Sequence, residues 1–90
     1  MVVDFPFQQE KRSGYLLREF KESIESEELI WHRDKKDRVV KVVRSYDWML
    51  QLDNELPTRL EEGKKYFIPK EVYHRIHKGK GNLVVKIYED

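Results

Sequence analysis

Three side chains that can coordinate a metal ion stand out in this 90-residue chain. His32 and Asp34 are separated by a single residue, and His74 follows much later. Two imidazoles and one carboxylate suit non-haem iron, manganese or nickel and leave coordination positions open. Zinc also accepts these ligand types. The residues therefore predict a divalent metal site (Fe, Mn, Ni or Zn) at His32, Asp34 and His74, with room for a small-molecule ligand.

These side chains can meet only if the segments that carry them turn the same faces inward. Beyond the first third of the chain, apolar residues recur with a period of two, which is typical of β-strands. By this period His32 and Asp34 share one side of a strand with Ile30, and His74 lies on the apolar side of a later strand. His77 falls on the opposite side from His74, so we exclude it from the site.

Short strands separated by turns are expected along most of the chain. Alternation of apolar residues predicts strands within 38–44, 48–53, 66–68, 72–77 and 83–88. Turn residues fall between them, at 53–57 and at 79–82. Many short strands at close spacing indicate an all-β sandwich or a small barrel, and a closed barrel leaves no strand edge exposed.

The first thirty residues are less regular. We expect residues 1–14 to form an N-terminal arm and residues 15–90 to form a single barrel domain. Residues 15–29 carry apolar side chains at helical spacing, yet they also divide into a strand from Tyr15 to Phe20, a polar turn and a second strand starting near Glu28. We favour the strands because of the pattern that follows.

Gly63, Pro69 and His74 have a spacing that resembles a motif of the cupin superfamily of double-stranded β-helix barrels. The second cupin motif places a glycine, a proline and a histidine at the spacing of Gly63, Pro69 and His74. Glu71 stands where that motif has another glycine, and Lys78 stands where it has an asparagine. The resemblance, which covers about residues 26–88, implies a cupin-type barrel of about seven or eight antiparallel strands.

The first cupin motif is matched in spacing, but only His32 keeps its identity. Asp34 stands at the second histidine of that motif and Arg38 at its glutamate. In the family, these positions and the second-motif histidine bind a divalent metal inside the barrel. The resemblance thus implies His32 and His74 as ligands, with Asp34 as an oxygen ligand. Arg38 offers no lone pair to a metal, because its guanidinium stays protonated.

Other interpretations of the same residues remain open. The arrangement also resembles that of some cupin sugar isomerases and epimerases, which use a histidine and a carboxylate as an acid–base pair. In such a metal-independent site His74 would be the base, Asp34 its orienting carboxylate, and Arg38 or Tyr66 a substrate anchor. Arg38 and Asp34 could instead form an internal ion pair in a relic site. A non-catalytic ligand-binding or interaction module is the remaining alternative, with a partner face formed by Phe5, Phe7, Tyr73 and Tyr88. The predicted pocket is lined by His32, Asp34, Arg38, Trp48 and His74.

Composition narrows the class of protein. The 18 basic and 17 acidic residues balance to a formal charge of +1, which does not favour a nucleic-acid partner. The absence of cysteine excludes disulfides, thiolate zinc sites and thiol nucleophiles. No secretory signal and no apolar run of about 20 residues is present, so we expect a cytoplasmic protein without a membrane span. A small domain buries little surface, and we expect a homodimer formed through the N-terminal arm.

Overall fold

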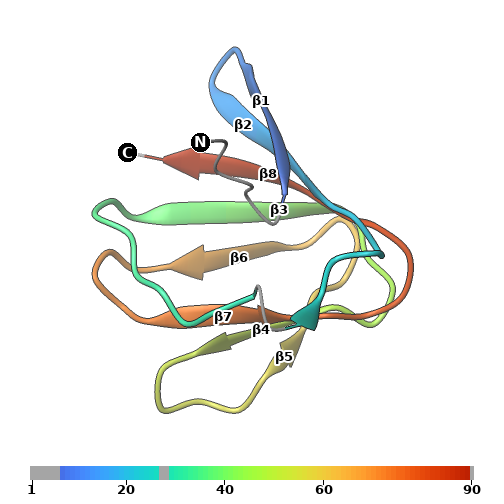
Figure 1. Cartoon of the computed structure of the whole chain (residues 1–90). Helices are drawn as coiled ribbons and strands as arrows, with labels where there is room; N and C mark the ends of the chain where they lie inside the picture. The colour runs from blue at the N-terminus through green and yellow to red at the C-terminus, as the bar shows by residue number, and fades with distance from the viewer. Residues whose placement is uncertain (1–6, 27–28, 90) are drawn as a thin grey trace, which may run out of the picture.

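The computed structural model describes residues 7–26 and 29–89 and consists of β-strands joined by turns and loops (Figure 1). All strand pairings are antiparallel, and no α-helix occurs within the described residues. The eight strands confirm the predicted all-β class and strand number. They are β1 (Gln8–Arg12), β2 (Tyr15–Phe20), β3 (Arg38–Arg44), β4 (Met49–Leu52), β5 (Thr58–Arg59), β6 (Lys65–Ile68), β7 (His74–His77) and β8 (Leu83–Glu89).

The strands form two sheets that face each other. The larger sheet has the order β1-β2-β8-β3-β6, and the smaller has the order β5-β4-β7. Strands far apart in sequence are neighbours: β8 lies between β2 and β3, with Val85 opposite both Arg18 and Val42. Figure 1 shows β4, β5 and β7 below the larger sheet, and the hydrophobic core contains residues of both sheets. Side chains on the facing surfaces of the two sheets therefore share one interior.

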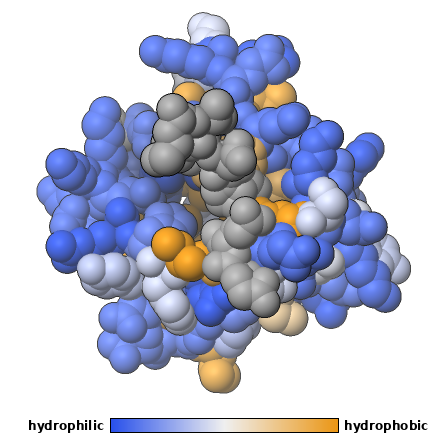
Figure 2. Space-filling model, in the orientation of Figure 1, coloured by the Kyte–Doolittle hydropathy of each residue, from blue (hydrophilic) through white to orange (hydrophobic). Residues whose placement is uncertain are grey.

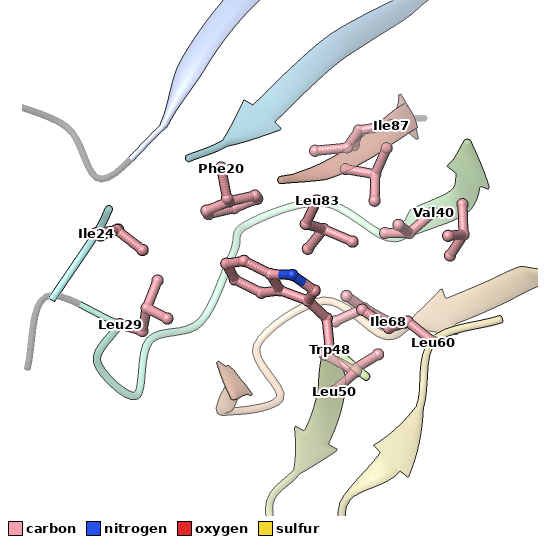
Figure 3. Close-up of a cluster of buried hydrophobic side chains, with 12 residues drawn as sticks. Phe20, Ile24, Leu29, Val40, Trp48, Leu50, Leu60, Ile68, Leu83 and Ile87 are labelled. Carbon is pink, nitrogen blue, oxygen red and sulfur yellow. The ribbon is translucent and has the colours of Figure 1, made fainter. Parts of the chain in front are cut away.

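Apolar alternation on the strands produces that interior. Leu83, Val85 and Ile87 on β8 are buried, as their spacing predicts, whereas the residues between them are half-buried. Trp48 is fully buried, and its indole Nε1 donates to the backbone oxygens of Lys80 and Gly81. Figure 3 shows Trp48 among apolar side chains from both sheets. The tryptophan thus ties the start of β4 to the turn before β8.

The expected arm is only partly described. Residues 1–6, including Phe5, lie outside the described residues, while Gln8–Arg12 form β1 and pair with β2 from Gln8↔Glu19 to Arg12↔Tyr15. All five β1 residues are exposed. This part of the segment is an edge strand of the larger sheet, because a two-residue turn at Ser13 and Gly14 folds it back onto β2.

The strand alternative for residues 15–20 is confirmed by β2, but the next expected strand is wrong where the structure describes it. Glu28 lies outside the described residues, and residues 29–37 contain only an isolated bridge at His32. Ile30 is 65% exposed and His32 is exposed, so the two do not lie on an inward strand face. Strand pairing within residues 29–37 is limited to the bridge between His32 and His74 on β7, so this segment is a loop.

Most of the charged residues face solvent. The view in Figure 2 is largely hydrophilic, with scattered hydrophobic side chains. This agrees with the high charged fraction of 39% being carried mostly on the outer faces of the strands. Across residues 7–26 and 29–89, no helix is long and apolar enough to cross a membrane.

Candidate metal centre

Backbone hydrogen bonds hold the loop of residues 29–37 against the start of β7. His32 and His74 exchange two of them, N–H to O at 3.0 Å in one direction and 2.8 Å in the other. The N–H of Glu71 donates to the carbonyl of Asp34 at 2.7 Å. The N–H of Lys70 donates to the Asp37 carboxylate at 2.8 Å. These contacts place a loop histidine and a loop aspartate beside a strand histidine.

The turn at Glu71 depends on an uncommon backbone conformation. Glu71 has a φ of 63°, in the left-handed region that glycine adopts most readily. This is the position at which the cupin motif has a glycine. Gly63, the first glycine of that motif, also has a positive φ, of 84°. Both positions therefore have a left-handed backbone conformation, although only residue 63 is a glycine.

The structure brings the three predicted ligands together. One ligand atom from each of His32, Asp34 and His74 lies within 4.8 Å of the other two. The two imidazole rings are 4.3 Å apart between centroids and are tilted by 59°. His32 is exposed at the mouth, Asp34 is half-buried and His74 is buried. The cluster thus reaches from the surface into the interior.

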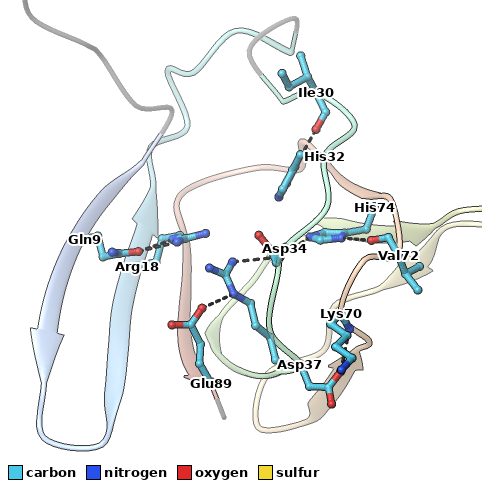
Figure 4. A network of polar contacts seen from close by, with 11 residues as sticks. Gln9, Arg18, Ile30, His32, Asp34, Asp37, Lys70, Val72, His74 and Glu89 are labelled. Atoms are coloured by element: carbon cyan, nitrogen blue, oxygen red, sulfur yellow. Dashed lines mark hydrogen bonds and ion pairs between the residues drawn. The ribbon is translucent and has the colours of Figure 1, made fainter.

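The same local contact orients both imidazoles. Nδ1 of His32 lies 3.0 Å from the carbonyl oxygen of Ile30, and Nδ1 of His74 lies 2.9 Å from that of Val72 (Figure 4). A carbonyl can only accept, so Nδ1 carries the proton in each ring and Nε2 of the neutral ring keeps its lone pair. Hydrogen bonds of this kind orient metal-binding histidines.

Asp34 is surrounded by groups that recognise a carboxylate but do not satisfy it. Its Oδ2 lies 3.3 Å from His74 Nε2 and 3.2 Å from Arg38 Nη1, yet this buried oxygen accepts no well-aligned hydrogen bond. The predicted Arg38–Asp34 ion pair is therefore present. Arg38 also contacts Glu89, with its Nε 2.7 Å from Oε2. Arg38 is thus shared between two carboxylates.

Burial lowers the pKa of His74 below its ordinary value. The neighbouring His32 and Arg38 act in the same direction, whereas Asp34 and the contact with Val72 oppose it. His74 is therefore neutral near pH 7, and its Nε2 lone pair faces the Asp34 carboxylate. A neutral imidazole is the form that binds metal ions.

The cluster opens into a cavity of about 430 Å³. Five polar side chains line it: Arg18, His32, Asp34, Arg38 and His74. The other lining residues are apolar and come from β2, β3, β4, β6, β7 and β8, and from residues 7, 29 and 30 outside the strands. Such a cavity, with a few converging polar groups, is the usual form of a small-molecule site.

Sequence reasoning missed Arg18. Its place in β2 offered a signal, because the period of two puts it on the same side as Leu16 and Phe20. Lys86 on β8 does not line the cavity, and its Nζ lies 5.0 Å from the centroid of the Tyr15 ring. The position of the charged Arg18 on the apolar face of β2 was therefore the signal that could have placed it in the cavity.

Some predicted pocket and surface residues have other roles. Trp48 belongs to the hydrophobic core and is not among the residues lining the cavity. The Tyr66 hydroxyl donates to the carbonyl of Arg59 and accepts from the N–H of Glu61, so it braces a turn rather than the cavity. His77 lies outside the cluster, as predicted, with its Nε2 2.8 Å from Gln51 Oε1. Phe7 packs against the core, and Phe5 lies outside the described residues.

Comparison with known proteins gives structural but no sequence relatives. No protein-family model and no curated protein matches this sequence. KdgF from Halomonas sp. is similar with a TM-score of 0.72 and 17% identity, over 99% of this chain and 84% of that one. A cupin-2 domain protein from Shewanella frigidimarina is similar with a TM-score of 0.63 and 20% identity, over 97% of this chain and 81% of that one.

A third similar structure is Fe(II) HppE, with a TM-score of 0.64 and 12% identity. The match covers 84% of this chain and 41% of that larger protein. One of the three is named as a cupin-2 domain protein, and at 20% identity or less the likenesses concern the fold alone. The described part of this chain therefore has the fold of the cupin superfamily.

Proposed function

We propose that this protein binds a divalent metal ion through His32, Asp34 and His74 and presents it to a small molecule in the cavity. One observation carries the proposal: the lone pair of His74 Nε2 and the buried Oδ2 of Asp34 face each other at 3.3 Å. Two electron-rich atoms at this distance repel each other unless a cation or a proton lies between them. Because burial disfavours protonation of His74, a metal ion fits this position better.

The residues present fit a metal of this kind. His32 contributes a second oriented Nε2 at the mouth of the cavity, and two imidazoles with one carboxylate leave coordination positions open. Arg38 does not prevent coordination, because it holds Glu89 more closely than Asp34 and so retains a carboxylate partner. Iron, manganese, nickel and zinc all accept this donor set.

The name of one similar structure, Fe(II) HppE, includes a ferrous ion, which supports a metal in this fold. A bound ion would supply a Lewis acid that polarises an oxygen of the ligand. The residues of this chain would orient the ion, exclude water through the apolar walls and place the ligand beside it. Whether catalysis follows depends on the ligand.

The metal-independent acid–base alternative receives less support from the geometry. A general base needs one imidazole nitrogen within reach of the substrate. Nδ1 of His74 donates to the Val72 carbonyl, and the remaining nitrogen, Nε2, faces the Asp34 carboxylate at 3.3 Å. Of the aromatic residues named for the interaction-module alternative, Phe7 packs against Phe20 and the core, whereas Tyr73 is exposed.

Metal binding to purified untagged protein tests the proposal. The protein is stripped with EDTA, reloaded separately with Mn²⁺, Fe²⁺, Ni²⁺ and Zn²⁺, dialysed, and assayed by elemental analysis and calorimetry. We expect one ion per chain. His32→Ala should weaken binding by at least about 10–100-fold, the loss that changes around a metal site commonly cause.

His77→Ala is the matched control, because it removes an imidazole that lies outside the cluster. It should leave the metal content and affinity unchanged. Substoichiometric metal that is the same in the wild type and in both variants would contradict the proposal. His32 is exposed, so its replacement does not disturb the core, and circular dichroism verifies folding.

A further inference from the structure

Among the residues that the structure describes, Arg18 is a cation in the cavity without a carboxylate partner. Its Nε and Nη2 lie 2.9 and 2.6 Å from the amide oxygen of Gln9, and its guanidinium carbon lies 3.8 Å from the centroid of Phe7. Among the described residues, no carboxylate oxygen lies within 4.0 Å of it. Burial, and next the charge of Arg38, lower the pKa of Arg18 to about 10. The charges of Asp34 and Glu89 oppose this shift without reversing it.

The contacts of Arg18 leave one edge of its guanidinium available. Gln9 takes the side edge, formed by Nε and Nη2. The end edge, formed by the two terminal nitrogens, still has a hydrogen on each and can bind a carboxylate through two parallel hydrogen bonds. Figure 4 shows the Arg18 side chain pointing from β2 toward Asp34, and both residues line the same cavity.

The distribution of charge favours an anion beside Arg18. Arg38 forms ion pairs with both nearby carboxylates, Asp34 and Glu89, and neither of them forms an ion pair with Arg18. The charges of Arg18, Arg38, Asp34 and Glu89 sum to zero. A divalent ion at the proposed centre would raise this sum to +2. An anionic ligand would reduce that charge and would also give Arg18 its missing partner.

The remaining walls define the rest of the ligand. Phe20, Leu50, Ile68 and Val85 are among the apolar residues that line the cavity. They offer no hydrogen-bond donors to the additional oxygens and charge of a phosphate dianion, whereas a carboxylate has two oxygens and one charge. A hydrocarbon or weakly polar body would be stabilised by burial against these walls.

The geometry points to Arg18 as the anchor for the carboxylate of a small amphipathic acid, whose body fills the apolar cavity and whose functional group reaches the centre at Asp34. The approach of the functional group to the centre at Asp34 rests on the proposed metal site. The carboxylate subsite itself rests only on Arg18, its open edge and the apolar walls, so the two can be tested separately.

The test uses hexanoate and its neutral analogue hexanamide with metal-free protein in EDTA, and follows amide chemical shifts by NMR titration. We expect hexanoate to bind about 10-fold more tightly or better, as a charge-assisted hydrogen-bonded pair implies. Arg18→Gln should remove this preference. Arg12→Gln is the matched control, since it removes an exposed arginine paired with Glu10 on β1 and should keep the preference.

A second variant covers the case in which Arg18→Gln does not fold. Gln9→Glu keeps Arg18 but supplies an internal carboxylate at an exposed position, and it should weaken hexanoate binding while hexanamide binding is unchanged. Equal binding of acid and amide by the wild type, or an unchanged preference in folded Arg18→Gln, would overturn the subsite. Tighter binding of inorganic phosphate than of hexanoate, with the same dependence on Arg18, would overturn the assignment of a carboxylate.

Adding Mn²⁺ then separates the two proposals. If both hold, the paramagnetic ion broadens the signals of bound hexanoate in the wild type and not in His32→Ala, which still prefers acid over amide. A preference for the acid without any effect of Mn²⁺ would uphold the Arg18 subsite and contradict the metal site. Broadening without a preference for the acid would uphold the metal site and contradict the Arg18 subsite.

Discussion

Replacement of Glu71 by glycine tests whether the turn that holds Asp34 is strained. Glu71 has a φ of 63°, and a residue with a side chain in this region costs about 1–2 kcal/mol. Glycine avoids that cost, but its greater freedom in the unfolded chain takes back about 0.4–1 kcal/mol. We therefore expect Glu71→Gly to be more stable than Glu71→Ala by about 1 kcal/mol, which corresponds to roughly 4–8 °C in Tm for a domain of this size.

The comparison with alanine isolates the backbone. Both variants lose the exposed contact between Arg33 and Glu71, at 3.6 Å, so its small contribution cancels. Urea unfolding of metal-free protein measures the difference, because a bound metal would add its own stabilisation. The N–H of residue 71 still donates to the Asp34 carbonyl in both variants, so metal affinity should not change.

Lys70 provides the control position, since it is exposed and does not have a positive φ. There the order should reverse, and Lys70→Ala should be more stable than Lys70→Gly by about 0.4–1 kcal/mol. If Glu71→Ala proved as stable as Glu71→Gly, the left-handed conformation would be refuted. The link between this turn and the missing motif glycine would be refuted with it.

Three further outcomes are expected. Gly79→Ala should cost about 3 kcal/mol in urea unfolding, because the new Cβ would overlap a backbone oxygen of the turn before β4; a cost below 1 kcal/mol would contradict that packing. Leu83→Ala, in the fully buried core, should cost about 3 kcal/mol, whereas Leu56→Ala, at an 86% exposed position, should cost almost nothing. Burial, and then the charge of Arg75, hold the pKa of His77 below its ordinary value of 6.5, so NMR titration should find a lower midpoint that rises in Arg75→Gln. Folding thus lowers this pKa, the unfolded chain binds more protons as pH falls through 6.5, and the contribution of His77 to stability declines in that direction.

The strands and the second motif were predictable because their signals are local. Alternation at Leu83, Val85 and Ile87 specifies which face of a strand is buried, whichever neighbour it pairs with. A glycine–proline–histidine spacing around a turn likewise reports backbone geometry within a dozen residues. The apolar alternation and the motif spacing can both be recognised in a single sequence, even though Glu71 stands in place of a motif glycine.

The loop before β3 was not predictable in the same way. Period-two spacing at Ile30, His32 and Asp34 favoured an inward strand, but the structure leaves Ile30 and His32 exposed. His32 reaches the site because its backbone bridges that of His74, and Asp34 because its carbonyl accepts from Glu71. The expected residues meet, although the element that carries two of them is a loop.

The sequence by itself determined the residue types of the centre, the strand faces and the turns, because these follow from covalent identity and from the short periods of the backbone. Only the tertiary structure decided which inward side chains share a cavity. It placed Trp48 in the core, brought Arg18 from β2 toward Asp34, and paired Arg38 with Glu89 from the far end of the chain. Such neighbours depend on sheet order and long-range register, which no local pattern of residues encodes.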